Sequence, residues 1–171
     1  MPRRLVVIHE QSRNFPLSRV AMIRCLFLYY MICPLILFRC DLALPPEGGT
    51  FWQHLLYPLS HANLLHWALN GFSLLTLATR LTWGRTAWAY IFSVIAGYIY
   101  TPDLPLLGMS TIVYFYLGML FIHLSSWRRW RIAIIVCAGL FIPGIAAVTH
   151  IMMLCFGIFS EAFRINGNRL K

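Results

Sequence analysis

Long apolar runs alternate with short polar segments along the chain, and this pattern predicts membrane-spanning helices. A span of the bilayer needs about 20 mainly apolar residues. The first four predicted spans cover residues 20–38, 59–79, 86–100 and 107–124. The apolar and aromatic stretch 50–59 is too short to cross, so we expect it to lie in the membrane interface.

The last apolar run, 132–163, is too long for one average span and short for two. Pro143 and Gly144 give a turn signal in its middle. We therefore predict a fifth helix before this turn and a sixth helix after it. One long tilted helix is the alternative.

The positive charges agree with six spans. The chain has 14 Lys and Arg. With the N-terminus in the cytoplasm, only Arg39 falls on the outer side, and cytoplasmic loops are expected to carry the Lys and Arg excess. A single final helix would place the C-terminal charges outside. We expect a basic cytoplasmic segment 1–19, a membrane domain 20–163 and a basic cytoplasmic tail 164–171.

Composition supports a multi-pass integral membrane protein. Hydrophobic residues make up 60% of the chain and charged residues 11%, against about 45–50% and 25% in soluble domains. The net charge of +9 does not indicate nucleic acid binding, because the charges lie between apolar runs instead of in one patch. No small-residue cleavage site follows the first apolar run, so no secretory signal is predicted.

The five cysteines predict neither a zinc site nor a redox site. None of them forms a C-x-x-C pair. Cysteine commonly packs as a small apolar residue, which is the role we expect for all five.

The fourth predicted span carries a serine on a distinctive helix face. Ser110, Tyr114 and Gly118 are spaced i, i+4 and i+8, so they share that face. A single serine in a membrane helix usually hydrogen-bonds only a carbonyl of the preceding turn. A catalytic role for Ser110 therefore requires a base and hydrogen-bond donors from elsewhere in the chain.

Polar residues in other spans supply those groups. His66 and Asn70 share a face of the second span at i and i+4, whereas His61 lies about 140° around the helix and serves another neighbour. His150 lies near the start of the sixth span. Such residues often hydrogen-bond neighbouring helices, but buried polar groups in lipid also mark function. The charge layout places His66, Asn70, Ser110 and His150 in the outer half of the membrane, which favours one shared site.

The predicted chemistry is nucleophilic attack on a carbonyl. His150 is the candidate base that takes the Ser110 proton. His66, Asn70 and the Ser110 backbone N–H are candidate donors to the resulting oxyanion. Tyr114 is expected to pack its ring on His150. No acidic residue lies within a span near these groups, so a Ser-His dyad is predicted instead of a triad.

Two glycines are predicted to form the contact between the fourth and sixth spans. Gly118 lies on the Ser110 face, and Gly157 lies two turns below His150. Small residues allow membrane helices to approach closely. We therefore expect Gly157 to be the surface that Gly118 meets.

These motifs resemble those of the rhomboid intramembrane serine proteases, and the resemblance runs over most of the chain. The matching positions are Trp52 in the first loop, His61-x4-His66-x3-Asn70 in the second span, Gly108-Met109-Ser110 with Tyr114 and Gly118 in the fourth, and Thr149-His150 with Gly157 in the sixth. The separate motifs are short, but their order, spacing and membrane sidedness are together fairly specific.

The resemblance implies an all-α bundle of six transmembrane helices. It implies a catalytic dyad of Ser110 and His150, and an oxyanion hole formed by His66, Asn70 and the Ser110 amide. It also implies cleavage of a single-pass membrane protein near the outer surface, with no cofactor, metal or nucleic acid. The expected location is the bacterial inner (plasma) membrane, in contact with lipid, with both termini in the cytoplasm.

Four positions depart from the family pattern. They are Thr111 for glycine, Met153 for glycine, Thr149 for alanine and Gln53 for arginine. A bulky Met153 would push His150 away from Ser110, and misplacement by about 1 Å can lower a rate about 100-fold. A pseudoprotease of the same fold that binds membrane protein clients without cutting them is therefore the main alternative.

An unrelated metal-handling or transport protein is the third hypothesis. It would use His54, His61, His66 and His150, because imidazole groups suit transition metals. No carboxylate and no second ligand pair at i and i+4 accompanies these histidines.

Overall fold

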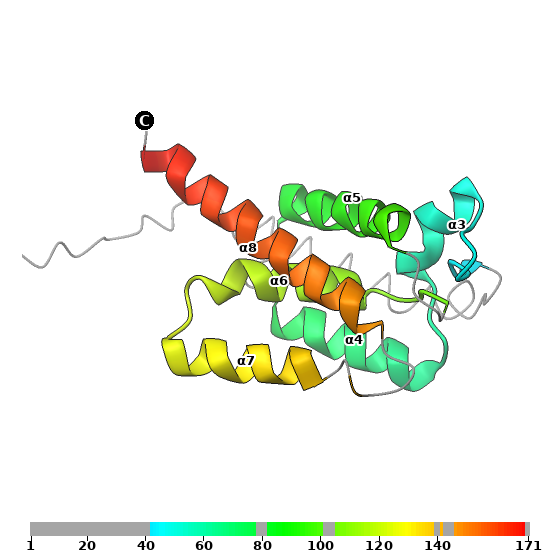
Figure 1. The fold of residues 1–171 in the computed structure, drawn as a ribbon, viewed down its shortest axis with the longest axis horizontal. Helices are drawn as coiled ribbons and strands as arrows, with labels where there is room; N and C mark the ends of the chain where they lie inside the picture. Colours follow the sequence, from blue (N-terminus) through cyan, green and yellow to red (C-terminus); the bar gives the residue numbers. More distant parts are fainter. Residues whose placement is uncertain (1–41, 78–81, 101–104, 139–140, 142–145, 170–171) are drawn as a thin grey trace, which may run out of the picture.

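The computed structural model describes residues 42–77, 82–100, 105–138, 141 and 146–169, and this part of the chain is all-α (Figure 1). Its elements are α3 (Phe51–Leu56), the 3-10 helix η2 (Tyr57–Leu59), α4 (Leu64–Thr76), α5 (Trp83–Ile99), α6 (Ser110–Phe121), α7 (Ser126–Ala138) and α8 (Ala147–Arg169). Leu44 and Leu106 form an isolated antiparallel bridge, and the described ranges contain no strand.

Five predicted helices occur near their expected positions. Helices α4, α5 and α6 correspond to the second, third and fourth predicted spans, and the last apolar run forms α7 and α8. The alternative of one long final helix is wrong, because α7 ends at Ala138 and α8 begins at Ala147. The predicted first span 20–38 and the segment 1–19 lie outside the described residues.

Several predicted boundaries are wrong. Helix α4 begins at Leu64, because the Asn63 side chain caps it by accepting from the His66 backbone N–H. Helix α7 begins at Ser126, so the arginine cluster expected to close the fourth span lies within α7. Helix α8 continues to Arg169, whereas the membrane boundary at residue 163 stays a prediction.

One helix of the described part is long and apolar enough to cross a membrane. It is α8, over Ala147–Gly167. Helix α6 is also apolar but shorter. The lengths and compositions are thus weakly consistent with membrane association, and the six-span arrangement remains a prediction.

Helix α6 lies at the centre of the described bundle. Seven of its residues are buried, among them Ile112, Phe115 and Tyr116. Helix α8 lies diagonally across α6, with α5 on one side and α4 and α7 on the other (Figure 1). The first turns of α6 and α8 therefore come together.

A hydrogen-bonded chain fixes the segment that leads into α6. The Tyr57 hydroxyl donates to the Ser93 carbonyl at 2.5 Å, and the Ser93 hydroxyl lies 2.7 Å from that of Thr111. Burial raises the pKa of Tyr57 to about 12, so the phenol stays protonated and remains a donor. The Tyr57 carbonyl also accepts from the Gly108 N–H at 3.0 Å. These bonds connect η2, α5 and the start of α6.

A buried carboxylate joins three helices at the other end of α8. Glu161 is 2% exposed. It accepts from Arg164 at 2.5 Å and from His123 at 2.8 Å, and it lies 3.8 Å from Arg85 of α5. Because an ionised carboxylate is costly to bury without partners, this cluster fixes the distal half of α8 against α5 and the end of α6.

Candidate active site

Ser110 and His150 meet where α6 and α8 begin. Ser110 is the first residue of α6, and His150 lies in the first turn of α8. The Ser110 Oγ lies 2.9 Å from His150 Nε2. This distance is within the range for proton transfer between a nucleophile and its base. The predicted dyad therefore has hydrogen-bond geometry.

Tyr114 supports the imidazole, as predicted. Its ring stacks on that of His150 with centroids 4.2 Å apart and planes 8° apart. With Nε2 accepting from the Ser110 hydroxyl, the neutral imidazole carries its proton on Nδ1. Nδ1 is buried and has no hydrogen-bond partner among the described residues. Within that part, no acidic third member orients the ring, and ring stacking takes over this role.

The predicted glycine contact holds the two helices together. A Cβ on Gly118 would overlap the Leu154 carbonyl oxygen and lie 3.0 Å from the Gly157 Cα. A Cβ on Gly157 would overlap the Phe115 carbonyl oxygen. The α6 and α8 backbones are therefore in direct contact two turns below the dyad, and this contact sets their separation at Ser110 and His150.

His66 and Asn70 border the segment that precedes Ser110. Gly108 has φ +95°, and a Cβ there would lie 2.7 Å from His66 Cε1 and 3.3 Å from Asn70 Nδ2. Asn70 Nδ2 is buried without a hydrogen-bond partner in the described ranges. This donor is therefore available to a ligand in the cavity.

One cavity connects the predicted site residues. Its volume is about 570 Å³, within the range of roughly 300–1,000 Å³ that is usual for ligand pockets. Ser110, His150, His66, Asn70 and Tyr114 all line it. The Ser110 backbone N–H belongs to the first turn of α6, whose N–H groups have no acceptor within the helix. The cavity thus brings together the predicted nucleophile, the predicted base and several hydrogen-bond donors.

His61 lies before α4, not on it, so the predicted angle around the helix does not apply. Its ring meets that of His66 edge-on with centroids 5.2 Å apart. Its Nε2 accepts from the Met109 backbone N–H at 3.5 Å. His61 therefore contacts the segment just before Ser110.

The two departures nearest the site do not disrupt the dyad. Met153 is fully buried in the core, yet the Ser110 to His150 distance stays at 2.9 Å. Thr111 lines the cavity, but its hydroxyl is engaged by Ser93. A long distance between Ser110 Oγ and His150 Nε2 would have favoured a pseudoprotease, and the two atoms are instead within hydrogen-bond reach.

Sequence reasoning missed two groups that shape this region. Tyr57 and Ser93 anchor the loop before α6, and Glu161 anchors the distal end of α8. Glu161 carried a usable signal, because an acidic residue in an apolar helix requires partners. Tyr57 carried none, because aromatic residues are common in interfacial stretches.

The structure gives no support to the metal-handling hypothesis. No three His, Cys, Asp or Glu side chains within the described ranges form a group able to hold a metal ion. His54 stacks on Tyr98 with centroids 3.8 Å apart, and its Nδ1 lies 3.0 Å from the Thr50 carbonyl.

Comparison of the chain with known protein families finds no match, and comparison with curated proteins finds none either. The functional argument therefore rests on the motifs and on the geometry of the site.

Replacing Gly108 with alanine is expected to lower activity at the site by about 100-fold. The new Cβ would contact His66 and strain a backbone with positive φ, and a displacement of about 1 Å can have this effect. Gly48→Ala is the control, because Gly48 has φ +88° but no atom within 4 Å of its Cβ position. The measurement is the rate at which a serine-directed probe labels each variant. Equal rates in both variants would show that contact with His66 is unimportant.

Proposed function

We propose that the chain is an intramembrane serine protease that hydrolyses a peptide bond in or near the transmembrane segment of a membrane protein. The 2.9 Å contact between Ser110 Oγ and His150 Nε2 carries this proposal. The stacked Tyr114 ring and the donors around one cavity support it. The resemblance to rhomboid proteases also supports it, because the same residues match that family in their order, spacing and predicted membrane sidedness.

In the first step, Ser110 Oγ attacks the carbonyl carbon of the scissile peptide bond. His150 Nε2 takes the hydroxyl proton. The carbonyl oxygen becomes an oxyanion, with Asn70 Nδ2, His66 and the Ser110 N–H as its proposed donors. These donors come from two helices, α4 and α6, and all three residues line the same cavity.

In the second step, the tetrahedral intermediate collapses. The C–N bond breaks, the His150 proton passes to the leaving amine, and an acyl ester remains on Ser110. Water then attacks the ester, and His150 takes a proton from that water and returns it to Ser110 Oγ. Both half-reactions use the same base, and no acidic residue is required to change protonation state.

The proposed substrate is a single-pass membrane protein that is cut near the outer surface. We place the chain in the bacterial inner membrane as a six-span protein with cytoplasmic termini. The strong inward bias of Lys and Arg supports this orientation. It also places Ser110 and His150 in the outer half of the bilayer, where water can reach the acyl ester.

Labelling with a serine-directed fluorophosphonate tests the proposal. We expect the purified wild-type protein in detergent to be labelled and Ser110→Ala to be unlabelled. Ser160→Ala is the control and should be labelled like the wild type, because Ser160 lies on α8 outside the dyad and outside the cavity lining. Equal labelling of wild type and Ser110→Ala would contradict the proposal. Folded wild-type protein that is never labelled, but that binds membrane clients, would favour the pseudoprotease.

A further inference from the structure

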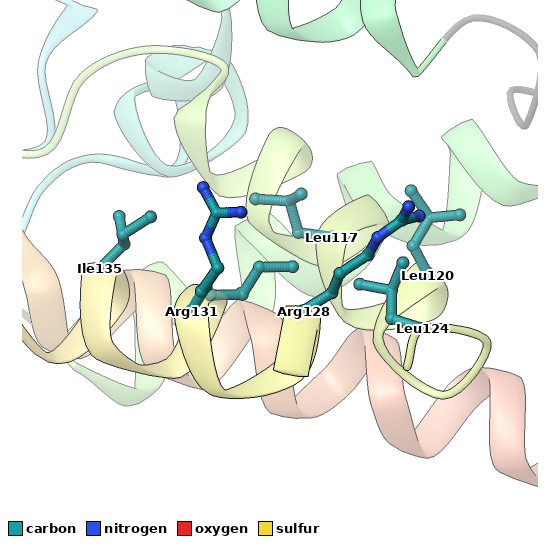
Figure 2. Close-up of a pocket in the computed structure, with 7 residues that line it drawn as sticks. Leu117, Leu120, Leu124, Arg128, Arg131 and Ile135 are labelled. Atoms are coloured by element: carbon teal, nitrogen blue, oxygen red, sulfur yellow. The ribbon is translucent and has the colours of Figure 1, made fainter. Parts of the chain in front are cut away.

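A second cavity lies between α6 and α7, and it shares only Leu117 with the lining of the candidate active site. Its volume is about 330 Å³, which is at the lower end for ligand pockets. The residues that line it are Leu117, Leu120, Leu124, Arg128, Arg131, Ile132 and Ile135. Figure 2 shows the two arginine side chains rising from α7 toward the leucines of α6. We call this cavity the α6–α7 groove.

Helix periodicity makes each wall of the groove continuous. Arg128, Arg131 and Ile135 are spaced i, i+3 and i+7 along α7, so they form one face. Helix α7 buries only Val136. Its groove face is therefore little covered by other described elements.

The groove has an apolar wall and a basic rim formed by two arginines. Arg128 and Arg131 have no acidic partner in the part of the chain that the structure describes. Two acidic residues occur in that part. Glu47 is exposed, and Glu161 is already occupied by Arg164, His123 and Arg85. An anion for the arginine pair must therefore come from outside these residues.

Exposed aromatic residues place the same end of α7 at a membrane surface. Trp127 and Trp130 flank the arginines and are 71% and 67% exposed. Tryptophan is enriched where a membrane meets water. The groove accordingly has a basic rim at the level expected for lipid headgroups. Its leucine and isoleucine walls suit a hydrocarbon chain.

We propose that the α6–α7 groove is a binding site for an anionic phospholipid. The lipid phosphate accepts hydrogen bonds from Arg128 and Arg131, because guanidinium groups match phosphate oxygens well. One acyl chain follows the apolar walls toward Ile135. Basic pockets between membrane helices on the cytoplasmic side bind anionic headgroups in this way. The site requires membrane insertion, but it does not require catalysis by Ser110.

Native mass spectrometry of the full-length protein tests the headgroup contact. The detergent-purified protein is titrated with dioleoylphosphatidylglycerol or dioleoylphosphatidylcholine. We expect tighter binding of the phosphatidylglycerol, and about tenfold weaker binding after Arg128→Gln or Arg131→Gln. Arg129→Gln is the control, because Arg129 lies outside the groove lining and glutamine removes the same charge from the same turn. Arg129 Nε donates to the Leu124 carbonyl at 2.8 Å, and the glutamine amide is also a donor. A Lys replacement of both groove arginines keeps the charge and should retain preference for the anionic lipid.

A second pair of variants tests the acyl-chain contact. Ile135→Gln puts a polar group into the groove, whereas Ile134→Gln changes an equally exposed neighbour outside its lining. Only the Ile135 variant should weaken binding. Equal affinity for both lipids, or equal losses for groove and control variants, would overturn the proposal. Either result could occur with fluorophosphonate labelling intact, so failure of the lipid site is distinguishable from failure of the protease.

Discussion

Replacing His150 with alanine is expected to lower kcat for peptide cleavage by about 10³-fold. The imidazole is the proposed base, and its Nε2 lies 2.9 Å from Ser110 Oγ. Without it, the serine hydroxyl must lose its proton to water during attack. The measurement is single-turnover cleavage of a reconstituted transmembrane substrate, with KM expected to change little because the proposed loss is in the chemical step.

Two comparisons separate a catalytic role for His150 from a packing role. Because Ser110 and His150 act as a unit, the double alanine variant should be no slower than Ser110→Ala alone. Tyr114→Phe keeps the ring that stacks on the imidazole, so its rate should stay near wild type. A His150→Ala protein that cleaves at the wild-type rate would exclude the proposed dyad.

Replacing Gly157 with alanine is expected to destabilise the protein by about 3 kcal/mol, the upper end for overpacking a core. The new Cβ would overlap the Phe115 carbonyl oxygen and lie 3.0 Å from the Met119 N. Backbone atoms cannot move aside as a flexible side chain can, so α6 and α8 must separate. The measurement is thermal unfolding in detergent together with the cleavage rate, which should fall about 100-fold if the dyad opens by about 1 Å.

Gly167→Ala is the matched control for this substitution. Gly167 lies on the same helix, but no atom lies within 4 Å of its Cβ position. Alanine is the better helix former by about 0.8–1.0 kcal/mol, so this variant should be neutral or slightly more stable. Equal stability of the Gly157 and Gly167 variants would contradict the close backbone contact at the crossing.

The helices and the dyad were predictable because their signals are local. Apolar runs and a Pro-Gly turn indicated where most helices lie. Ser110, Tyr114 and Gly118 were recognisable from helix periodicity, and their contacts with His150 and Gly157 followed from pairing two helices by these faces. A small set of polar residues in apolar surroundings was therefore enough to assemble the site.

The helix starts were less predictable, because local chemistry competed with hydropathy. Asn63 caps α4 and so leaves His61 in the preceding loop. The Trp and Arg residues near 127–131 were interpreted as the end of the fourth span, yet they form the first turns of α7. Hydropathy averages over a window, whereas a cap depends on a single side chain.

The sequence could indicate that Glu161 needs partners, but it could not predict which residues they are. The partners His123 and Arg85 lie 38 and 76 positions away along the chain and meet Glu161 only after α5, α6 and α8 have packed. The same is true of Met153. Whether a large residue separates two helices depends on the space around it, and that space is a property of the folded core.

The Glu161 cluster and the glycine crossing together bear on how a substrate could enter. Helix α8 is attached to α6 at two separate levels, below the dyad and at its distal end. Helix α8 cannot move away from α6 without breaking one of these two sets of contacts. Ser110 and His150 are thus held in place before any substrate binds, and in the proposed protease we expect the opening that admits a peptide to involve elements other than α8.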